Sequence, residues 1–138
     1  MEAVLDCSLA LAWALPDETS ARADRFLARG SREDAFWVPA LWWYELTNAL
    51  TMAQRRRRLA DADVARLLEL YGGLPIHTDT FLGRDAAWRF HSLALEFALS
   101  AYDAAYLELA QRRGLALATL DRQLATAARK AGVKIARP

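Results

Sequence analysis

Ala3-Val4-Leu5-Asp6, near the start of the chain, is an apolar run that ends in an acid. A longer version of the pattern, Leu115-Ala116-Leu117-Ala118-Thr119-Leu120-Asp121, comes near the end. Apolar runs of this length are typical of buried strands, here at 3–5 and 115–119, and each is followed by residues that favour helices. Because buried strands that alternate with helices form parallel sheets covered on both faces, the two stretches indicate an α/β fold.

The sequence between these two runs continues the alternation. Further strands are expected at 36–38, 74–77 and 133–135. The predicted helices cover residues 8–15, 19 or 20–29, 40–57, 61–71, 84–97, 100–113 and 121–130. Pro16 is expected to end the first helix and Gly30 the second, which Thr19 or Ser20 would cap. Pro39 is expected at the start of the third.

Length, charge and cysteine content exclude several classes of protein. A chain of 138 residues can bury about two-thirds of its unfolded surface, and we expect residues 1–138 to form one domain. The net charge of +1 argues against a nucleic-acid binder held by bulk charge. Cys7 is the only cysteine, which excludes an intrachain disulfide and a cysteine-rich zinc site. With no signal-peptide pattern and no run of about 20 apolar residues, we expect a cytoplasmic protein that does not bind membranes.

Four acids are candidates for one shared site, and two of them stand at predicted strand ends. Asp6 and Asp121 each follow a predicted strand, and the carboxyl ends of parallel strands meet at one edge of the sheet. Both are also suited to cap the helices that follow them. Asp103 lies in the first turn of a predicted helix, where it would otherwise pair with Ser100 in a capping box. Glu45 lies in an apolar and aromatic stretch, so its carboxylate either reaches out to water or is held near a cation.

Together the four carboxylates indicate a metal site. If they share one sheet edge, their mutual repulsion raises some of their pKa values unless a cation is present. An all-oxygen set of ligands with no nearby His or Cys favours a hard ion such as Mg²⁺, with Mn²⁺ as a substitute. The chemistry that matches such an ion is hydrolysis of a phosphodiester by a metal-activated water.

The blocks of sequence that hold these acids resemble those of one family. They read Val4-Leu5-Asp6-Cys7-Ser8, Tyr44-Glu45-Leu46-Thr47-Asn48-Ala49-Leu50, Leu99-Ser100-Ala101-Tyr102-Asp103-Ala104-Ala105-Tyr106-Leu107 and Leu117-Ala118-Thr119-Leu120-Asp121-Arg122. In this order and at this spacing, they are similar to the PIN-domain ribonucleases, and most of all to the VapC toxins of VapBC toxin–antitoxin pairs. The resemblance covers essentially the whole chain.

The resemblance implies a fold, an activity and partners. The fold is a three-layer α/β/α sandwich with a short parallel sheet of four or five strands. The activity is Mg²⁺- or Mn²⁺-dependent cleavage of RNA, by a homodimer that a cognate antitoxin inhibits. The catalytic and metal-binding acids would be Asp6, Glu45, Asp103 and Asp121, with Ser8 and Thr119 as polar support near the metal.

Two other functions fit the same residues less well. One is an RNA-processing nuclease of the same family that has no antitoxin. The other is a non-catalytic receiver-type signalling module, which is also an α/β protein with acids at strand ends. Receivers carry paired acids after the first strand, whereas Asp6 stands alone there.

A run of four arginines at 55–58 closes one of the predicted helices. It is either a solvated helix end that complements the negative pole of the helix dipole or a clamp for RNA phosphates. A protein with almost no net charge would need such a localised basic patch to hold RNA.

Overall fold

The computed structural model describes residues 1–15, 21–28 and 34–136 of the chain. Its strands are β1 (Glu2–Leu5), β2 (Ala35–Pro39), β3 (Ile76–Asp79) and β4 (Ala116–Ala118). Its helices are α1 (Cys7–Ala14), α2 (Ala21–Ala28), α3 (Leu41–Arg55), α4 (Asp61–Gly72), α5 (Arg84–Phe97), α6 (Ala101–Arg113) and α7 (Arg122–Lys130). The strands pair in parallel, in the order β3-β2-β1-β4, which confirms the predicted α/β class.

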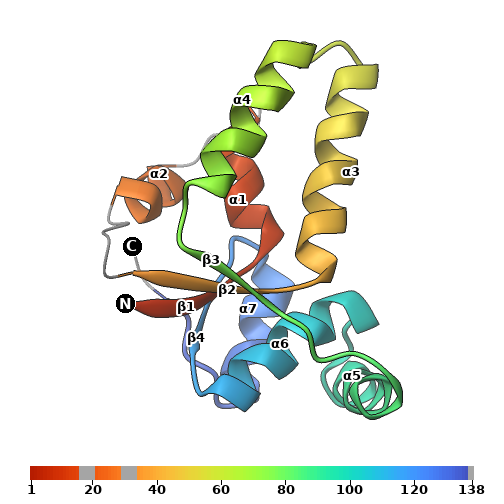
Figure 1. Cartoon of the computed structure of the whole chain (residues 1–138). Helices are drawn as coiled ribbons and strands as arrows, with labels where there is room; N and C mark the ends of the chain where they lie inside the picture. Colours follow the sequence, from red (N-terminus) through yellow and green to blue (C-terminus); the bar gives the residue numbers. More distant parts are fainter. Residues whose placement is uncertain (16–20, 29–33, 137–138) are drawn as a thin grey trace.

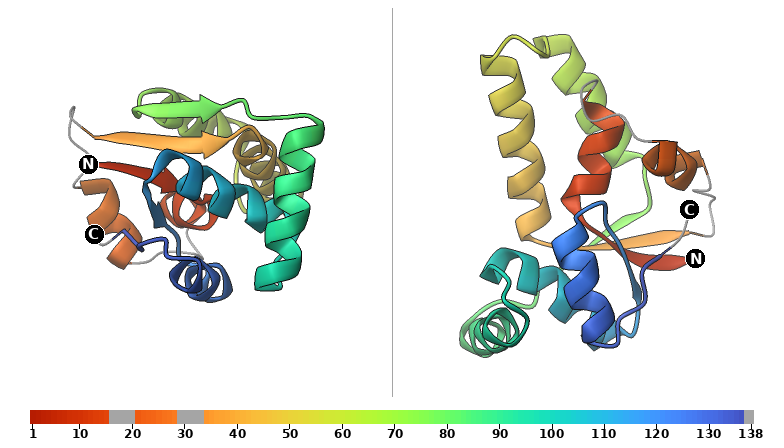
Figure 2. Two further views of the ribbon diagram at one scale, coloured as in Figure 1. Left: turned by 90° about the horizontal axis from the view of Figure 1, so that it is seen from below. Right: turned by 180° about the vertical axis from the view of Figure 1, so that it is seen from behind.

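Helices cover both faces of the sheet and give the molecule three layers. Figure 1 shows α1, α2, α3 and α4 on one side of the sheet and α5, α6 and α7 on the other. The views in Figure 2 show the same division, with α3 and α4 forming a long hairpin that projects away from the sheet. This is the α/β/α sandwich that the resemblance implies, with four strands in its sheet. In the described part of the chain, no helix is both long and apolar enough to cross a membrane.

The centre of the sheet is buried because its short apolar strands are covered from both sides. Ala3, Val4 and Leu5 of β1 have no exposed surface. Trp42 of α3 is equally buried and packs edge-on against Tyr71 of α4, with 5.8 Å between the ring centroids. Large apolar side chains buried in this way contribute about 1.5–3 kcal/mol each relative to exposed ones. The core is therefore built on β1, the strand that ends beside Asp6.

The helix α6 passes through the interior of the second helical layer. Its residues 104–110 are all buried, because α6 packs on β1 and β2 and also contacts α5 and α7. Ser100 begins the helix, with its Oγ accepting a hydrogen bond from the N–H of Asp103 at 3.1 Å. Gly114 ends it in the left-handed conformation, with φ of 65°, which favours glycine. This packing fixes the start of α6, and with it Asp103, at the carboxyl edge of the sheet.

The prediction of a fifth strand at 133–135 is wrong. This segment makes only an isolated bridge, between Ile135 and Leu117. β4 has three residues, and its hydrogen bonds with the passing chain join Leu117 to Lys134 and Ala136, whereas the N–H of Val133 donates to Ala128 at the end of α7.

The strand predicted at 74–77 is shifted along the chain. Its ladder with β2 begins where Ile76 faces Phe36 and ends where Asp79 faces Pro39. Pro39 is therefore the last residue of a strand instead of the start of a helix. The register between two strands sets these limits, and it cannot be read from either strand alone.

Helix limits agree with the prediction to within about two residues. α5 matches it completely, whereas α3 ends at Arg55 because the backbone of Arg57 turns left-handed, with φ of 59°. The predicted signals at Pro16, Thr19, Ser20, Arg29 and Gly30 lie outside the described residues.

Candidate active site

Asp6 lies where the order of the strands reverses. The chain passes from β1 to β2 and β3 on one side, and β4 then returns to the other side of β1. In open α/β sheets, such a reversal leaves a crevice beyond the carboxyl ends of the strands. Asp6 directly follows β1 and donates its backbone N–H to the carbonyl of Ala118, the last residue of β4, at 2.9 Å. Asp121 follows β4, so the two acids predicted at one edge come from adjacent strands.

Two hydroxyl groups hold the carboxylate of Asp6. Ser8 Oγ and Thr119 Oγ1 each donate to Asp6 Oδ2 at 2.6 Å. The hydroxyls are oriented in turn, because the N–H of Leu120 donates to Ser8 and the N–H of Asp121 donates to Thr119. The side chain of Asp6 makes no capping hydrogen bond to α1, so helix capping does not account for this acid. The residues predicted as polar support therefore contact Asp6 directly.

Asp121 uses one of its oxygens as a helix cap. Its Oδ1 accepts the N–H groups of Gln123 and Leu124, at 2.9 and 3.1 Å, which confirms the capping interpretation. Its Oδ2 has no hydrogen bond to any described residue. Capping thus leaves one oxygen of Asp121 available for another ligand.

Glu45 reaches the same region from the first turns of α3. It is half-buried, and its Oε1 accepts a hydrogen bond from the hydroxyl of Tyr106 on α6 at 2.5 Å. Burial, the charge of Asp6 and the contact with Glu45 all raise the pKa of Tyr106, so the phenol keeps its proton and donates. Glu45 is therefore directed inward. Tyr106 belongs to the block that resembles PIN domains, but no sequence pattern indicated its contact with Glu45.

Asp103 lies in the first turn of α6 with its carboxylate unused by the cap. The backbone N–H of Asp103 donates to Ser100, which is one half of the predicted capping box. Among the described residues, no return bond joins the Asp103 carboxylate to Ser100. The positive pole of the helix dipole favours a negative charge at this position.

These four residues, Asp6, Glu45, Asp103 and Asp121, form what we call the acid cluster. Burial raises the pKa of Asp6, the two hydroxyls lower it in part, and the charge of Asp121 raises it further. Burial likewise raises the pKa of Glu45, the Tyr106 hydrogen bond lowers it in part, and the charges of Asp6 and Asp103 raise it further. Asp103 has a pKa raised by burial and by the charges of Asp6 and Asp121. No described Lys or Arg forms an ion pair with any of the four.

The acid cluster suits a hard divalent cation in the type and charge of its donors. Every ligand it offers is a carboxylate oxygen, and a divalent ion would relieve the repulsion within the cluster. As the side chains lie, no three His, Cys, Asp or Glu residues of the described part are arranged to hold a metal ion. The donor set therefore fits Mg²⁺ or Mn²⁺, and the ion would have to draw the carboxylates together.

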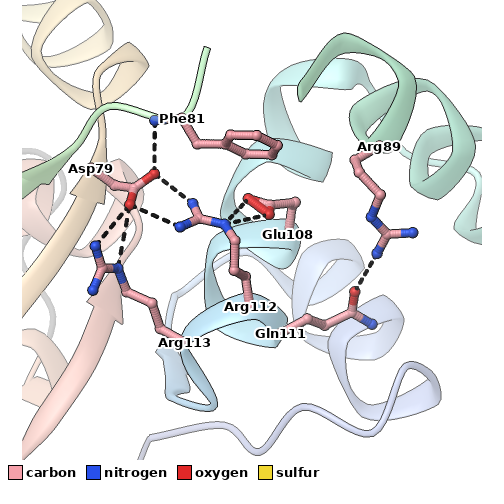
Figure 3. Close-up of polar contacts among 7 residues, drawn as sticks. All are labelled: Asp79, Phe81, Arg89, Glu108, Gln111, Arg112 and Arg113. Carbon is pink, nitrogen blue, oxygen red and sulfur yellow. Dashed lines mark hydrogen bonds and ion pairs between the residues drawn. The ribbon is translucent and has the colours of Figure 1, made fainter. Parts of the chain in front are cut away.

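A second carboxylate group lies at the end of β3, and the sequence did not indicate it. Figure 3 shows Asp79 between the guanidinium groups of Arg112 and Arg113. Arg112 donates to both oxygens of Asp79 and also to Glu108, while Arg113 donates to Asp79 Oδ1 at 3.0 Å. Burial raises the pKa of Asp79, but the hydrogen bonds from Arg112, the Phe81 amide and Arg113 outweigh it and hold the pKa below its usual value. This Asp79 cluster ties the end of α6 to β3.

The four arginines at 55–58 lie away from the acid cluster. They are exposed at the tip of the hairpin between α3 and α4 (Figure 1). Ten residues of helix, a rise of about 15 Å, separate Glu45 from Arg55. Their role as an RNA clamp stays a prediction.

Comparison with known proteins identifies the family. The family profile described as PIN domain matches residues 3–130. Ribonuclease VapC3 of Pyrobaculum aerophilum is 33% identical to the chain over 129 residues, which are 91% of this chain and 93% of that relative.

Solved structures share the fold. The crystal structure of PAE2754 from Pyrobaculum aerophilum has a TM-score of 0.69 at 27% identity, and the match covers 92% of this chain and 84% of that one. VapBC2 from Rickettsia felis, solved with a DNA fragment from its promoter, has a TM-score of 0.69 at 10% identity, over 99% of this chain and 98% of that one. The PIN-domain match rules out the receiver-type module. The chain belongs to the PIN-domain family and, within it, to the VapC group of ribonucleases.

Proposed function

We propose that this protein is the toxin of a VapBC-type toxin–antitoxin pair and that it cleaves RNA at the acid cluster with Mg²⁺ or Mn²⁺. The observation that carries the proposal is that Asp6, Glu45 and Asp103 repel one another, that Asp121 repels Asp6 and Asp103, and that no described cation pairs with any of the four. Acids whose pKa values are perturbed in this way are typical of functional sites. The 33% identity to a ribonuclease supports RNA as the substrate.

The residues that would hold the ion are Asp6, Glu45, Asp103 and Asp121. The ion, when bound, supplies a Lewis acid that lowers the pKa of a water and stabilises the oxygen that leaves the phosphodiester. Asp6 is kept in one orientation by Ser8 and Thr119. Glu45, whose pKa burial and its acidic neighbours raise, is suited to accept a proton from the attacking water at Oε2.

A cognate antitoxin would block the same cluster. We expect one of its arginines to enter, because a guanidinium pairs bidentately with carboxylates and keeps its charge. Arg112 already neutralises Asp79 in this manner within the chain. An antitoxin that bound away from Glu45 and Asp103 and left the metal in place would contradict this expectation. A neighbouring gene for a small DNA-binding protein would favour the toxin over an RNA-processing nuclease without antitoxin.

We also propose that the protein acts as a homodimer in the cytoplasm. Two large apolar side chains on α5, Trp88 and Leu95, are 67% and 73% exposed. They stand seven residues apart, on one face of the helix, and exposed apolar faces of this kind mark contacts with other proteins. Light scattering after size-exclusion chromatography would give the mass of two chains, and a single-chain mass at micromolar concentration would contradict the dimer.

The decisive test of the activity is cleavage of total RNA by the purified protein. Reactions would contain EDTA, Mg²⁺ or Mn²⁺, with Asp6→Asn as the matched control. We expect cleavage by the wild type in either metal and none in EDTA or by the variant. Cleavage that EDTA does not stop, or that Asp6→Asn performs equally well, would refute the proposed function.

A further inference from the structure

Tyr106 joins two helices at the acid cluster. It lies on α6, three residues after Asp103, and has no exposed surface. Its hydroxyl donates to Oε1 of Glu45 at 2.5 Å, across a separation of 61 residues in the sequence. Through this contact α6, the helix that carries Asp103, also reaches the carboxylate that α3 supplies.

Glu45 depends on such a contact to stay at the cluster. Asp6 and Asp103 repel its carboxylate, and a glutamate side chain loses much conformational freedom when it is held in one place. Within the described residues, no cation pairs with Glu45 and no side chain other than Tyr106 donates to it. The hydroxyl of Tyr106 is thus the group that opposes the turning of Glu45 toward bulk water.

We propose that Tyr106 is a positioning residue of the ribonuclease site: its hydroxyl holds Oε1 of Glu45, so that Oε2 stays available to the ion or to water. The inference rests on the proposed function. Tyr106 itself touches neither RNA nor metal in this role, and it acts through Glu45 alone. Partners that orient metal ligands in this way typically affect metal affinity or activity by about 10- to 100-fold.

Tyr71 provides a matched control within the same chain. It is 1% exposed, and its hydroxyl donates to the backbone carbonyl of Ala10 at 2.6 Å. Tyr71→Phe and Tyr106→Phe each delete one buried hydroxyl and the hydrogen bond that it donates. Both variants should therefore lose some stability. Only Tyr106→Phe should disturb the acid cluster.

The experiment compares the wild type, Tyr106→Phe and Tyr71→Phe in three measurements. These are kcat and KM on a single-stranded RNA that the wild type cleaves, the Kd of Mn²⁺ from calorimetry without RNA, and Tm in EDTA. For Tyr106→Phe we expect kcat to fall and the Kd of Mn²⁺ to rise, each by about 10-fold, with KM unchanged. For Tyr71→Phe we expect wild-type kcat and Kd with a lowered Tm. In a Glu45→Ala background, adding Tyr106→Phe should change neither kcat nor Kd.

Several results would overturn the inference, and they differ from a failure of the proposed function. Wild-type kcat and Mn²⁺ affinity in Tyr106→Phe would show that the hydroxyl does not position Glu45. A further loss of either in the Glu45→Ala background would show that Tyr106 acts through packing. A wild-type protein that neither cleaves RNA nor binds Mn²⁺ would refute the proposed function, and the role of Tyr106 with it.

Discussion

Asp6 and Asp79 are acids of the same kind in similar places, and their surroundings are opposite. Both lie at the carboxyl end of a strand, at 5% and 8% exposure. Asp79 accepts hydrogen bonds from two arginines, and its pKa is lowered despite its burial. Asp6 accepts them from two hydroxyls, and burial raises its pKa in spite of them. The two acids are alike in burial and in strand position but differ in counter-charge. This difference distinguishes Asp79, a structural acid, from Asp6, a candidate metal ligand.

The largest difference expected between the two clusters is in catalysis. Asp6→Asn, or the matching amide at any other position of the acid cluster, should lower metal-dependent RNA cleavage more than about 100-fold, because even the outer partners of metal ligands matter by about 10- to 100-fold. Asp79→Asn should keep the activity within about twofold at temperatures where it is folded. Initial rates measured beside circular dichroism give the comparison. Full activity in any one acid-cluster variant would remove that residue from the site.

For stability we expect the opposite: the larger loss should come from the substitution in the Asp79 cluster. Asp79→Asn leaves Arg112 and Arg113 without their shared carboxylate and should lower the free energy of unfolding by about 2 kcal/mol. This is less than for a fully buried pair, because the two arginines are 36% and 34% exposed. For a domain of this size the change corresponds to a fall in Tm of about 5–8 °C. A Tm within about 1 °C of the wild type would mean that the Asp79 cluster contributes little to the fold.

Divalent ions should stabilise the protein through the acid cluster. At about ten times its Kd, Mg²⁺ bound only by the folded state adds roughly 1.4 kcal/mol and raises Tm by about 3–5 °C. Asp79→Asn should show the same Mg²⁺ shift as the wild type, from its lower starting point. Differential scanning calorimetry in EDTA and in Mg²⁺ measures both shifts. A shift that Asp6→Asn leaves intact would place the ion elsewhere.

Asp103→Asn distinguishes repulsion from helix capping at one position. Removing this charge relieves the repulsion, so the Tm of the metal-free protein should rise and the Mg²⁺ shift should shrink. A capping role would instead cost roughly 0.5–1 kcal/mol. The bond that the structure has, from the Asp103 N–H to Ser100, is a backbone bond that the substitution leaves in place. A metal-free Tm that falls, with an unchanged Mg²⁺ shift, would make Asp103 a helix cap only.

The smallest expected effect is an opposite dependence of stability on pH in the two clusters. The pKa of Asp79 is lowered, so its stabilising contribution is complete above the unfolded value of about 3.9 and is lost as pH falls through the folded value. The pKa values of Glu45 and Asp103 are raised, so without metal these groups reduce stability as pH rises from their unfolded to their folded values. In EDTA, the Tm of Asp79→Asn should fall less than that of the wild type as pH is lowered. The Tm of Asp103→Asn should fall less than that of the wild type as pH is raised. Unchanged profiles in both variants would contradict the two pKa directions.

Helices were easier to predict than strands because their signals are local. The spacing of apolar residues in α5 and the Ser100 cap of α6 lie within the elements they define, and both helices have the predicted extent to within one residue. The limits of β3 and the loss of the strand at 133–135 depend on what pairs with them, so no local pattern reveals them. The Asp79 cluster was missed for the same reason: Glu108 and Arg112 are one turn apart, but Asp79 comes from a distant strand.

The α/β class, the candidate acids and their resemblance to PIN domains follow from the amino-acid sequence alone, because these depend on composition, periodicity and short blocks. Which acids have a counter-charge depends on the fold. It placed Asp6 at the reversal of strand order, brought Tyr106 to Glu45, and gave two arginines to Asp79 but none of the described ones to the acid cluster. The energy of a carboxylate depends on the charges and donors within a few ångströms of it. Those neighbours come from segments far apart in the chain, and folding alone brings them together.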